Sequence, residues 1–528
     1  MTSLARCDDG GRDKKHHIGH VSQFPPGSTR QVQVGQESVF VSHRAGNLSC
    51  TSASCPHYSG GLLQCGTELH CPRHGASFNL ETGAVIRGPC TTPVQTFPIS
   101  ITPDSELKVD LTHKPPAPMA VRDPKDSRVF LIVGGGAAGA AAAEELRTLG
   151  FTGRLVMFTR EKYPPYDRPL LTKSASVSLD DLLIQLPSDC EVWTNTEIVE
   201  VDDDKVTLFG GEKIPFTKAL ICTGAKPRQL PGLSGNVHAV RSFDDFEKLK
   251  QALNPNLNIC IVGSSFVGME IVSTLLNSGC RKLTIVASEE LPFERTFGKP
   301  LGRVFARFLI QRGITYIPKT QIVKYAGNVL ELSDGRTLPC DLVVVGAGAT
   351  PNVPSLKNAT LRSDGSVETV GSGLNVAGMN NVHAAGDCAT VSYKGNLTRI
   401  EHWSVAMNQA RSAARAMLDQ NQKDEQEHVP FFWTHVLGKA VRFVGHLSGM
   451  KWTSFAVEGD MEDKLDFIGF YVDSQGMILA AVGMGEIGEK MIPIVSILMN
   501  RKLLPSSNFL VNHSRGPSAA LEELFATL

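Results

Sequence analysis

Four side chains able to bind metal stand on two short stretches near the amino terminus. Cys55-Pro56-His57 carries the first thiol and imidazole, and Cys71-Pro72-Arg73-His74 carries the second thiol and imidazole. Glycines follow both stretches, at Gly60-Gly61 and at Gly75. If one metal centre binds all four side chains, the fold has to bring two separate loops to the same point. This requirement constrains the amino-terminal part of the chain more than any other feature.

The ligand set is that of a Rieske [2Fe–2S] cluster, in which two cysteines hold one iron and two histidines hold the other. A structural Cys2His2 zinc site uses the same four side chains and is the alternative. Zinc modules usually pair cysteine with cysteine and histidine with histidine, whereas here each stretch contributes one of each. The mixed pairs and the glycines after them favour the cluster over zinc, and over a chance grouping of loop residues. We therefore interpret Cys55, His57, Cys71 and His74 as cluster ligands.

The residues around these ligands predict a small antiparallel β domain over residues 21–112. Short runs of alternating or β-branched residues occur at Gln31–Val34, Ser38–Val41 and Leu107–Val109, and no helical period appears. Gly88-Pro89 predicts a third turn, suited to shield the cluster from solvent.

The segments on either side of this domain lack signs of a core. Residues 1–20 have no apolar region typical of a secretory signal and do not resemble a mitochondrial presequence, so we interpret them as a disordered tail. Residues 113–125 begin with several prolines and are predicted to form a linker.

Bulk properties bound the function classes. The formal net charge of −1 gives no general attraction to nucleic acid, so no nucleic-acid partner is predicted. The sequence has no apolar run of about 18 residues, so no transmembrane helix is expected. The 12 cysteines are scattered along a long chain, which favours a reducing compartment over a disulfide framework. We expect a cytoplasmic protein, with mitochondrial association as the alternative, and a monomer or homodimer.

A buried strand, a glycine-rich turn and a helix follow one another from residue 129. Val129–Val133 leads into Gly134-Gly135-Gly136-Ala137-Ala138-Gly139, and the helix continues to Leu149. A second strand, Leu155–Phe158, ends close to Glu161. About 20 residues after the last glycine is where a carboxylate binds the ribose of a dinucleotide whose pyrophosphate rests on the helix N-terminus. The sequence therefore predicts a dinucleotide site here.

A second copy of this pattern begins at Asn258–Val262 and continues into Gly263, Ser265 and Gly268. Two dinucleotide sites in one chain predict FAD in the first and NAD(P)H in the second. The first carboxylates after the next strand are Glu289 and Glu290, and no arginine stands there to bind a 2′-phosphate. NADH is therefore favoured over NADPH, with Glu289 as the ribose ligand.

Three apolar strands end at glycine turns. Thr223-Gly224 and Gly348 end two of them, and we interpret both as crossings between the nucleotide-binding domains. Gly386-Asp387 ends the third and delivers one carboxylate, suited to the ribityl hydroxyls of a flavin. A helix is predicted over 405–418 and a polar surface loop over 419–428, and the remaining strands and helices are predicted to form a packing domain without catalytic residues.

Several motifs together carry a family resemblance that covers nearly the whole chain. They are Cys55-Pro56-His57-Tyr58, Pro165-Tyr166-Asp167-Arg168-Pro169, Thr172-Lys173, Gly386-Asp387, Ile400-Glu401-His402-Trp403 and Phe431-Phe432-Trp433. With them the chain resembles the apoptosis-inducing-factor-like flavoproteins that have an N-terminal Rieske domain. It is also similar to the ferredoxin reductases of bacterial oxygenase systems.

The resemblance implies a multidomain fold: an antiparallel β Rieske domain, two α/β Rossmann-like domains for FAD and NAD, and a C-terminal α+β domain. The implied FAD domain is split into residues 126–245 and 371–425. The NAD(P)H domain is inserted at 246–370, and a C-terminal reductase or interface domain follows at 426–528.

By the same resemblance, Lys173 lies near flavin N5 and pairs with Glu270, Arg168 lines the flavin, and Trp403 covers the flavin or nicotinamide face. These imply Lys173, Glu270 and Trp403 as catalytic residues. The full predicted cofactor-binding set is Gly134, Gly136, Ala137, Ala138, Gly139, Glu161, Arg168, Lys173, Thr223, Gly224, Gly263, Ser265, Gly268, Glu289, Gly348, Gly386, Asp387, His402 and Trp403.

The cluster loops differ from those of respiratory Rieske proteins, to which they are compared by the same resemblance. Gly60 and Arg73 stand where that type has an additional cysteine pair, so no bridging disulfide is expected. Ala76 and Phe78 replace the serine and tyrosine that donate hydrogen bonds to sulfur. Fewer donors stabilise the reduced cluster less, and we predict a low potential of about −150 mV.

These features predict an NAD(P)H-dependent FAD oxidoreductase that passes electrons to its own Rieske [2Fe–2S] cluster and on to an unknown acceptor, a protein or a small molecule. The alternative is an NADH-responsive signalling scaffold with little turnover. A dithiol–disulfide reductase is disfavoured because no cysteine occurs between Glu161 and Asp189. A Rieske oxygenase is disfavoured because no mononuclear iron domain is recognised.

Overall fold

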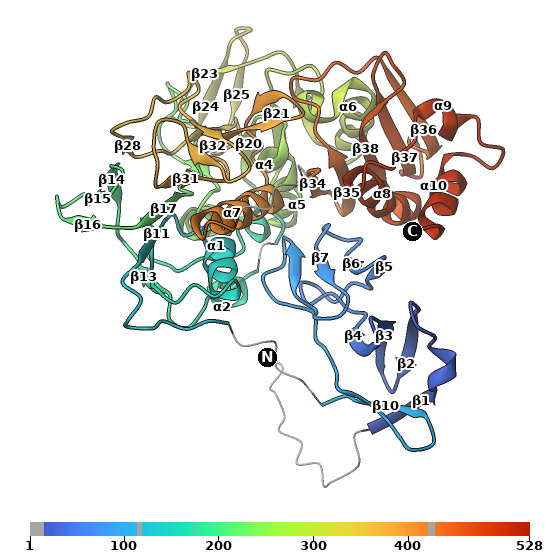
Figure 1. Ribbon diagram of the computed structural model, residues 1–528. Helices are drawn as coiled ribbons and strands as arrows, with labels where there is room; N and C mark the ends of the chain where they lie inside the picture. Colours follow the sequence, from blue (N-terminus) through green and yellow to red (C-terminus); the bar gives the residue numbers. More distant parts are fainter. Residues whose placement is uncertain (1–14, 113–118, 175, 421–427) are drawn as a thin grey trace. The chain divides into compact units, whose positions relative to one another are not determined.

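The computed structural model describes residues 15–112, 119–174, 176–420 and 428–528 (Figure 1). Contacts divide these residues into two compact units. The first runs to Pro72 and continues from Ala76 to the linker, and the second contains Arg73–Gly75 and Met119–Thr527.

The first unit consists of short antiparallel strands, as predicted. A three-stranded sheet has the order β1–β10–β9, a second has the order β2–β3–β4, and a four-stranded sheet has the order β5–β6–β7–β8. The bounds are β1 Lys15–His20, β2 Thr29–Val34, β3 Glu37–Arg44, β4 Asn47–Ser52, β5 Leu63–Cys65, β6 Glu68–His70, β7 Ser77–Asn79, β8 Val85–Arg87, β9 Ile99–Ile101 and β10 Glu106–Asp110, with a 3-10 turn at Val21–Gln23.

The interpretation of residues 1–20 as a disordered tail is wrong for Lys15–His20. This segment forms β1 and pairs antiparallel with β10, with His16 opposite Val109. Ile18 packs against the core that contains Leu107 and Val109. The pairing joins segments about 90 residues apart, so no local pattern in the polar, histidine-rich strand signals it. Residues 1–14 lie outside the described residues.

The second unit contains a nine-stranded sheet with the order β13–β12–β11–β17–β31–β30–β29–β32–β33. Its first five strands run parallel. The bounds are β11 Val129–Val133, β12 Arg154–Phe158, β13 Glu191–Trp193, β17 Lys218–Ile221, β29 Val367–Val370, β30 Asn375–Val376, β31 Val382–Ala384, β32 Ala389–Tyr393 and β33 Asn396–Thr398.

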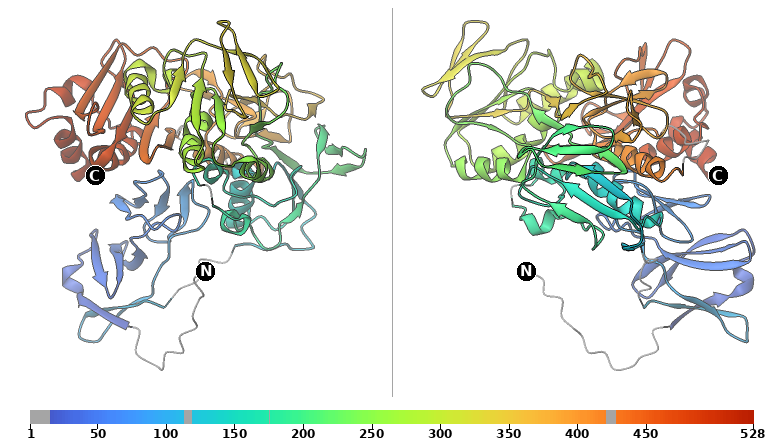
Figure 2. Two further views of the ribbon diagram at one scale, coloured as in Figure 1. Left: turned by 180° about the vertical axis from the view of Figure 1, so that it is seen from behind. Right: turned by 60° about the vertical axis from the view of Figure 1, so that its left-hand side comes forward.

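Helices α1 (Ala137–Thr148) and α7 (Trp403–Met417) lie side by side against this sheet (Figures 1 and 2). Their contact surface is rich in alanine, with Ala141 and Ala142 on α1 and Ala410 and Ala414 on α7. Small side chains let two helices approach closely. A Cβ on Gly386 would lie 3.7 Å from that of Ala138 on α1 and 3.2 Å from that of Ala406 on α7, so the two helix N-termini are neighbours.

A second parallel sheet has the order β19–β26–β20–β21–β22. The bounds are β19 Val237–Ala239, β20 Asn258–Val262, β21 Lys282–Val286, β22 Thr315–Ile317 and β26 Leu342–Val345, with helices α3 Phe243–Ala252, α4 Phe266–Glu270, α5 Val272–Asn277 and α6 Glu294–Gln311. The two predicted crossings lie side by side, because β18 (Ala225–Pro227) pairs antiparallel with β27 (Ala349–Pro351). Two α/β dinucleotide-type domains are thus present.

The borders between these domains differ from the predicted ones. The predicted borders fall after residues 245 and 370. β19 lies before the first border but belongs to the second sheet, and β29 lies before the second border but belongs to the first sheet. The order of strands in the two sheets decides these borders. That order depends on pairing between distant segments, so the glycine motifs alone do not predict it.

Antiparallel hairpins flank the two sheets, and the carboxy-terminal domain is α+β. The hairpin strands are β14 Ile198–Val201, β15 Lys205–Leu208 and β16 Lys213–Pro215 in one group, and β23 Ile322–Ala326, β24 Val329–Leu332 and β25 Thr337–Pro339 in the other. β28 Ser355–Leu356 pairs parallel with β14. Short helical turns lie at Arg168–Thr172 and α2 Leu179–Leu182. Within the predicted loop 419–428, residues 421–427 lie outside the described residues.

The carboxy-terminal sheet has the order β34–β35–β38–β37–β36 and is antiparallel (Figure 2). Its bounds are β34 Phe431–Val436, β35 Lys439–Gly445, β36 Ser454–Asp460, β37 Asp466–Val472 and β38 Ile478–Met484, followed by α8 Gly485–Asn500, α9 Ser507–Val511 and α10 Pro517–Ala526. In the described ranges, no helix combines the length and hydrophobicity needed to cross a membrane.

Candidate functional site

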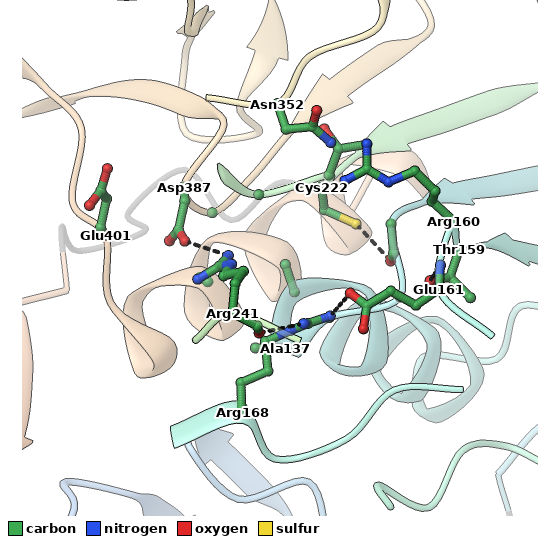
Figure 3. A pocket seen from close by; sticks show the side chains of 18 of the residues that line it. Ala137, Thr159, Arg160, Glu161, Arg168, Cys222, Arg241, Asn352, Asp387 and Glu401 are labelled. Atoms are coloured by element: carbon green, nitrogen blue, oxygen red, sulfur yellow. Dashed lines mark hydrogen bonds and ion pairs between the residues drawn. The ribbon is translucent and has the colours of Figure 1, made fainter. Parts of the chain in front are cut away.

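A cavity of about 490 Å³ in the second unit is lined by both nucleotide-binding domains and by the carboxy-terminal domain (Figure 3). Most of the residues predicted for the flavin line it. They are Gly134, Gly136, Ala137, Ala138, Glu161, Arg168, Lys173, Thr223, Gly224, Gly386, Asp387, His402 and Trp403, together with Glu270.

The first glycine loop leaves no room for a side chain at Gly134 or Gly139. A Cβ on Gly134 would lie 2.2 Å from the carbonyl oxygen of Cys222, and one on Gly139 would lie 2.2 Å from that of Gly134. Gly134 also has a φ of +131°, which favours glycine. The loop leads to Gly136, the N-cap of α1, which provides no side-chain cap. The first amides of α1 therefore suit a pyrophosphate, which fits a dinucleotide such as FAD.

The second glycine loop is built in the same way. Gly263 has a φ of +99°, and a Cβ on it would lie 2.4 Å from the carbonyl oxygen of Gly346. A Cβ on Gly268 would lie 2.2 Å from the carbonyl oxygen of Gly263. Ser265 is the N-cap of α4 and its side chain makes no capping bond. This loop lies at the end of β20, and only Phe266, Val267 and Glu270 from its helix line the cavity described above.

Glu161 is held by two donors. Arg168 donates to its Oε1 at 2.6 Å (Figure 3). The Tyr166 hydroxyl donates to its Oε2 at 2.6 Å. Tyr166 is 1% exposed, and it also accepts hydrogen bonds from Arg168 and from the backbone amide of Phe243. Burial raises the pKa of Tyr166, so its hydroxyl stays protonated. Sequence reasoning named Glu161 and Arg168 but missed Tyr166 as the residue that joins them.

Asp387 lies on the opposite side of the cavity and pairs with Arg241 at 3.1 Å (Figure 3). Gly386, with a φ of +80°, donates its amide hydrogen to Gln409 on α7 at 2.8 Å. Arg241 precedes the N-cap of α3, in a segment without any recognised motif, and sequence reasoning missed it.

Lys173 and Glu270 form the predicted ion pair, with 2.9 Å between Nζ and Oε2. Glu270 is 7% exposed and accepts two further hydrogen bonds, from the Thr172 hydroxyl at 2.5 Å and from the Thr434 hydroxyl at 2.7 Å. The pair thus joins the domain of β11 to the domain of β20. Neither threonine was identified as a contact of Glu270 from sequence.

His402 and Trp403 stand at the N-terminus of α7 and line the cavity. Burial, and then the charge of Lys173, lower the pKa of His402 to about 3. His402 is therefore neutral at physiological pH and can serve as a hydrogen-bonding group.

Glu289 pairs with Arg295 at 2.8 Å. The expectation that no arginine stands there to bind a 2′-phosphate is therefore corrected, because Arg295 at the start of α6 reaches back to Glu289. The Arg295 side chain is 81% exposed, so the pair is open to solvent. Gly348 lies after β26, in the crossing next to β27.

In the first unit, each cysteine stretch is closed by a backbone hydrogen bond. The Cys55 amide donates to the Gly60 carbonyl and the Cys71 amide donates to the Ala76 carbonyl, both at 2.8 Å. Cys55 is 1% and Cys71 2% exposed. A hydrogen bond with the neighbouring Cys71 thiol, and then burial, raise the pKa of Cys55.

Burial lowers the pKa of His57 to about 4, so its imidazole is neutral, the form that binds metal. Among the described residues, no three Cys, His, Asp or Glu side chains are assembled as a metal-binding group. The adjacent buried thiols and the neutral imidazole fit the donor types of a [2Fe–2S] cluster, in which thiolates and imidazoles bind different irons.

Comparison with known proteins reveals two family matches. Residues 14–98 match the Rieske [2Fe-2S] domain, and residues 129–410 match the family described as Pyridine nucleotide-disulphide oxidoreductase. These matches confirm the cofactor types expected from the sequence: FAD and NAD(P)H in the second unit and a [2Fe–2S] cluster in the first.

Individual relatives agree with these matches. Apoptosis-inducing factor 3 of Homo sapiens is 29% identical over 497 residues, which cover 88% of this chain and 81% of that protein. The 3-phenylpropionate/cinnamic acid dioxygenase ferredoxin–NAD(+) reductase component of Photorhabdus laumondii is 27% identical over 358 residues, or 64% of this chain and 88% of that protein. The predicted family resemblance is confirmed.

Among solved structures, the covalent putidaredoxin reductase–putidaredoxin complex superposes with a TM-score of 0.68 at 22% identity. The match covers 76% of this chain and 98% of that chain. At this identity the likeness shows the fold.

Proposed function

This chain belongs to the pyridine nucleotide-disulphide oxidoreductase family and is an NAD(P)H-dependent flavoprotein oxidoreductase, and we propose that it delivers electrons through FAD to its own Rieske cluster and then to an external acceptor. Similarity to ferredoxin–NAD(+) reductase components supports an acceptor of the electron-transfer class. When bound, FAD accepts a hydride from NAD(P)H and the cluster carries single electrons.

The residues proposed to hold FAD are those that line the cavity along α1 and α7. The uncapped N-terminus of α1 binds the pyrophosphate, and Glu161 binds the adenosine ribose while Tyr166 and Arg168 keep its carboxylate in place. Asp387, beside Arg241, binds the ribityl hydroxyls. Thr223, Gly224 and Gly386 bring backbone close to the ligand.

The observation that carries the proposal is the buried ion pair between Lys173 and Glu270 in the same cavity. A cation held beside the flavin favours negative charge on the reduced ring, and Glu270 keeps that cation in one position. Because the pair spans the two nucleotide-binding domains, it stands where the two cofactors have to meet. Trp403 limits access of water from the α7 side.

We propose Cys55 and Cys71 as ligands of one iron and His57 and His74 as ligands of the other. Ala76 and Phe78 are both fully buried and apolar, and neither side chain donates a hydrogen bond. This supports the expected potential of about −150 mV, at the low end for such clusters.

For the nicotinamide cofactor we propose NADH, with Glu289 accepting hydrogen bonds from the adenosine ribose. The Glu289–Arg295 pair is exposed, so Arg295 is able to leave Glu289 without a large cost. A 2′-phosphate at this position would meet the Glu289 carboxylate, which disfavours NADPH.

The test compares the wild-type holoprotein with Cys71→Ser, which removes one proposed iron ligand. NADH is expected to bleach the flavin of both proteins under anaerobic conditions, whereas only the wild type reduces a one-electron acceptor at a high rate. Equal acceptor reduction by both proteins would contradict the role of the cluster. Very slow turnover of the wild type with every acceptor, together with an NADH-dependent change in size, would instead support the signalling-scaffold alternative.

A further inference from the structure

We propose that Thr434, in the carboxy-terminal domain, is a positioning residue that holds the Glu270 carboxylate in the orientation needed for hydride transfer. The inference rests on the proposed function, because it assigns a role to the side chain that supports the Lys173–Glu270 pair. It gives the carboxy-terminal domain, which the sequence presents as a packing domain, a direct part in the reaction.

The donors around Glu270 are divided between its two oxygens. Oε2 faces the Lys173 ammonium at 2.9 Å and the Thr172 hydroxyl at 2.5 Å. Oε1 accepts from the Thr434 hydroxyl at 2.7 Å, and within the described ranges no other donor reaches this oxygen. Thr434 is 0% exposed, so water does not replace it from the solvent side. The division fixes the rotation of the carboxylate plane.

Three contacts align β34 with the helices that follow the second glycine loop. The ring of Phe432 meets Phe266 edge-on, with 5.2 Å between their centroids. Thr434 meets Glu270, and the amide of Leu437 donates to the Ser273 hydroxyl at 3.1 Å.

The spacing of these contacts follows the geometry of the two elements. Residues two apart on a strand point to the same face, as Phe432 and Thr434 do, and residues four apart on a helix share one side, as Phe266 and Glu270 do. The Thr434–Glu270 hydrogen bond thus lies between the Phe432–Phe266 and Leu437–Ser273 contacts, which fix the position of Thr434 from both directions along the chain.

Loss of the Thr434 hydroxyl has a defined consequence. A buried carboxylate oxygen without a donor is unfavourable, and a hydrogen bond to a charged group contributes about 1.5–3 kcal/mol. The carboxylate would then rotate so that both oxygens share Lys173 and Thr172. Lys173 would be drawn from its position in the cavity, while FAD and NADH would keep their own binding residues. We therefore expect a slower chemical step with little change in cofactor binding.

The experiment uses holoprotein carrying FAD and the cluster, mixed anaerobically with NADH while flavin absorbance is followed. Thr434→Val is expected to lower the limiting rate at saturating NADH by about tenfold or more, since 1.4 kcal/mol is a factor of ten. FAD content and the NADH concentration at half-maximal rate should change less than about twofold. Thr434→Ser, which keeps the hydroxyl, should recover most of the rate.

Thr369→Val is the matched control. Thr369 is 5% exposed and its hydroxyl also makes one buried hydrogen bond, to the Thr390 carbonyl at 3.0 Å, but it lies outside the cavity. This variant should keep the wild-type rate. If Thr434→Val slows reduction no more than Thr369→Val does, the positioning role is wrong.

A double-mutant cycle with Glu270→Gln separates this inference from the proposed function. Thr434→Val should slow reduction much less in the Glu270→Gln background than in the wild type, and it should lower the thermal unfolding midpoint more when Glu270 is present. Equal effects in both backgrounds overturn the inference. If Glu270→Gln alone leaves the rate unchanged, the proposed role of the ion pair fails instead.

Discussion

The Lys173 ammonium and the Glu270 carboxylate lie 2.9 Å apart although 97 positions separate them in the chain. One follows the short helical turn Arg168–Thr172 of the first nucleotide-binding domain, and the other ends α4 of the second. Their side chains are 13% and 8% exposed. Because the pair joins the two nucleotide-binding domains within the cavity, substitutions of either residue should slow electron entry.

Lys173→Met should slow reduction of the flavin by NADH by about tenfold to a hundredfold, because it removes the cation beside the flavin and leaves Glu270 with hydroxyl donors only. Lys226→Met is the control, since Lys226 is exposed on β18 and does not line the cavity. Anaerobic stopped-flow absorbance measures the rate. A Lys173→Met protein as fast as the control would show that the pair is structural.

Gly139→Ala should abolish FAD binding or leave only a small fraction of the protein loaded. Its Cβ would lie 2.2 Å from the Gly134 carbonyl oxygen, too close for the loop to keep its shape. Gly210→Ala is the control, because nothing lies within 4 Å of a Cβ at that position. The ratio of flavin absorbance to protein after purification measures loading, and equal ratios in both variants would argue against this loop as the FAD site.

Tyr166→Phe should weaken FAD binding by about tenfold while leaving bound FAD reducible by NADH. The variant removes the Tyr166 hydroxyl, which both donates to Glu161 Oε2 and accepts from the Phe243 amide. Fluorescence titration of the FAD-free protein with FAD gives the dissociation constant. An unchanged constant would mean that Arg168 alone orients Glu161.

Stability should fall in mild acid because of His402. Its pKa is lowered from 6.5 to about 3 by burial, so the unfolded state takes up a proton at a higher pH than the folded state does. The contribution of neutral His402 to the free energy of unfolding is complete above about pH 6.5. It is lost as the pH falls toward 3, by up to about 1.4 kcal/mol per pH unit. His383, His435 and His446 also have lowered pKa values from burial and act with the same sign.

His402→Gln should therefore make the thermal unfolding midpoint less dependent on pH than in the wild type, without removing the dependence entirely. Midpoints measured from about pH 7 to about pH 4.5 at constant ionic strength provide the comparison. A variant whose midpoint falls as steeply as that of the wild type would exclude His402 as a source of the acid sensitivity.

Glu289→Ala should reduce the preference for NADH over NADPH, since it removes both the ribose acceptor and the negative charge that repels a 2′-phosphate. We expect kcat/KM to fall about tenfold for NADH and to rise for NADPH. Glu290→Ala serves as the neighbouring control. Unaltered preference in Glu289→Ala would place the second ribose elsewhere.

Local patterns predicted the two glycine loops, because close backbone contacts exclude a Cβ at Gly134 and Gly139 in the first and at Gly263 and Gly268 in the second. The Lys173–Glu270 contact was reached only through the family resemblance, because nothing near either residue indicates the other. Arg241 and Thr434 were missed as contacts of the site residues, since each meets its partner only after strands or domains have packed. Tyr166 and Arg295 lie close in the chain to Glu161 and Glu289, but no recognised motif links either pair.

The same reason explains the errors in the fold. β1 pairs with β10, at the other end of the sequence of its domain. β19 pairs with β26 and β29 pairs with β30, so each belongs to a different sheet from the one predicted by its position in the sequence. The polar segment Lys15–His20 has too little hydrophobic alternation to identify it as a strand. Pairing over long sequence distances is not encoded in any short motif.

Electron paramagnetic resonance of the holoprotein after anaerobic addition of NADH tests the central claim most directly. We expect the flavin to bleach and the signal of a reduced Rieske cluster to appear in the same sample, and we expect Lys173→Met to delay both. A bleached flavin without any signal from the cluster, in protein shown by iron and sulfide analysis to carry it, would contradict electron transfer from the flavin to the cluster.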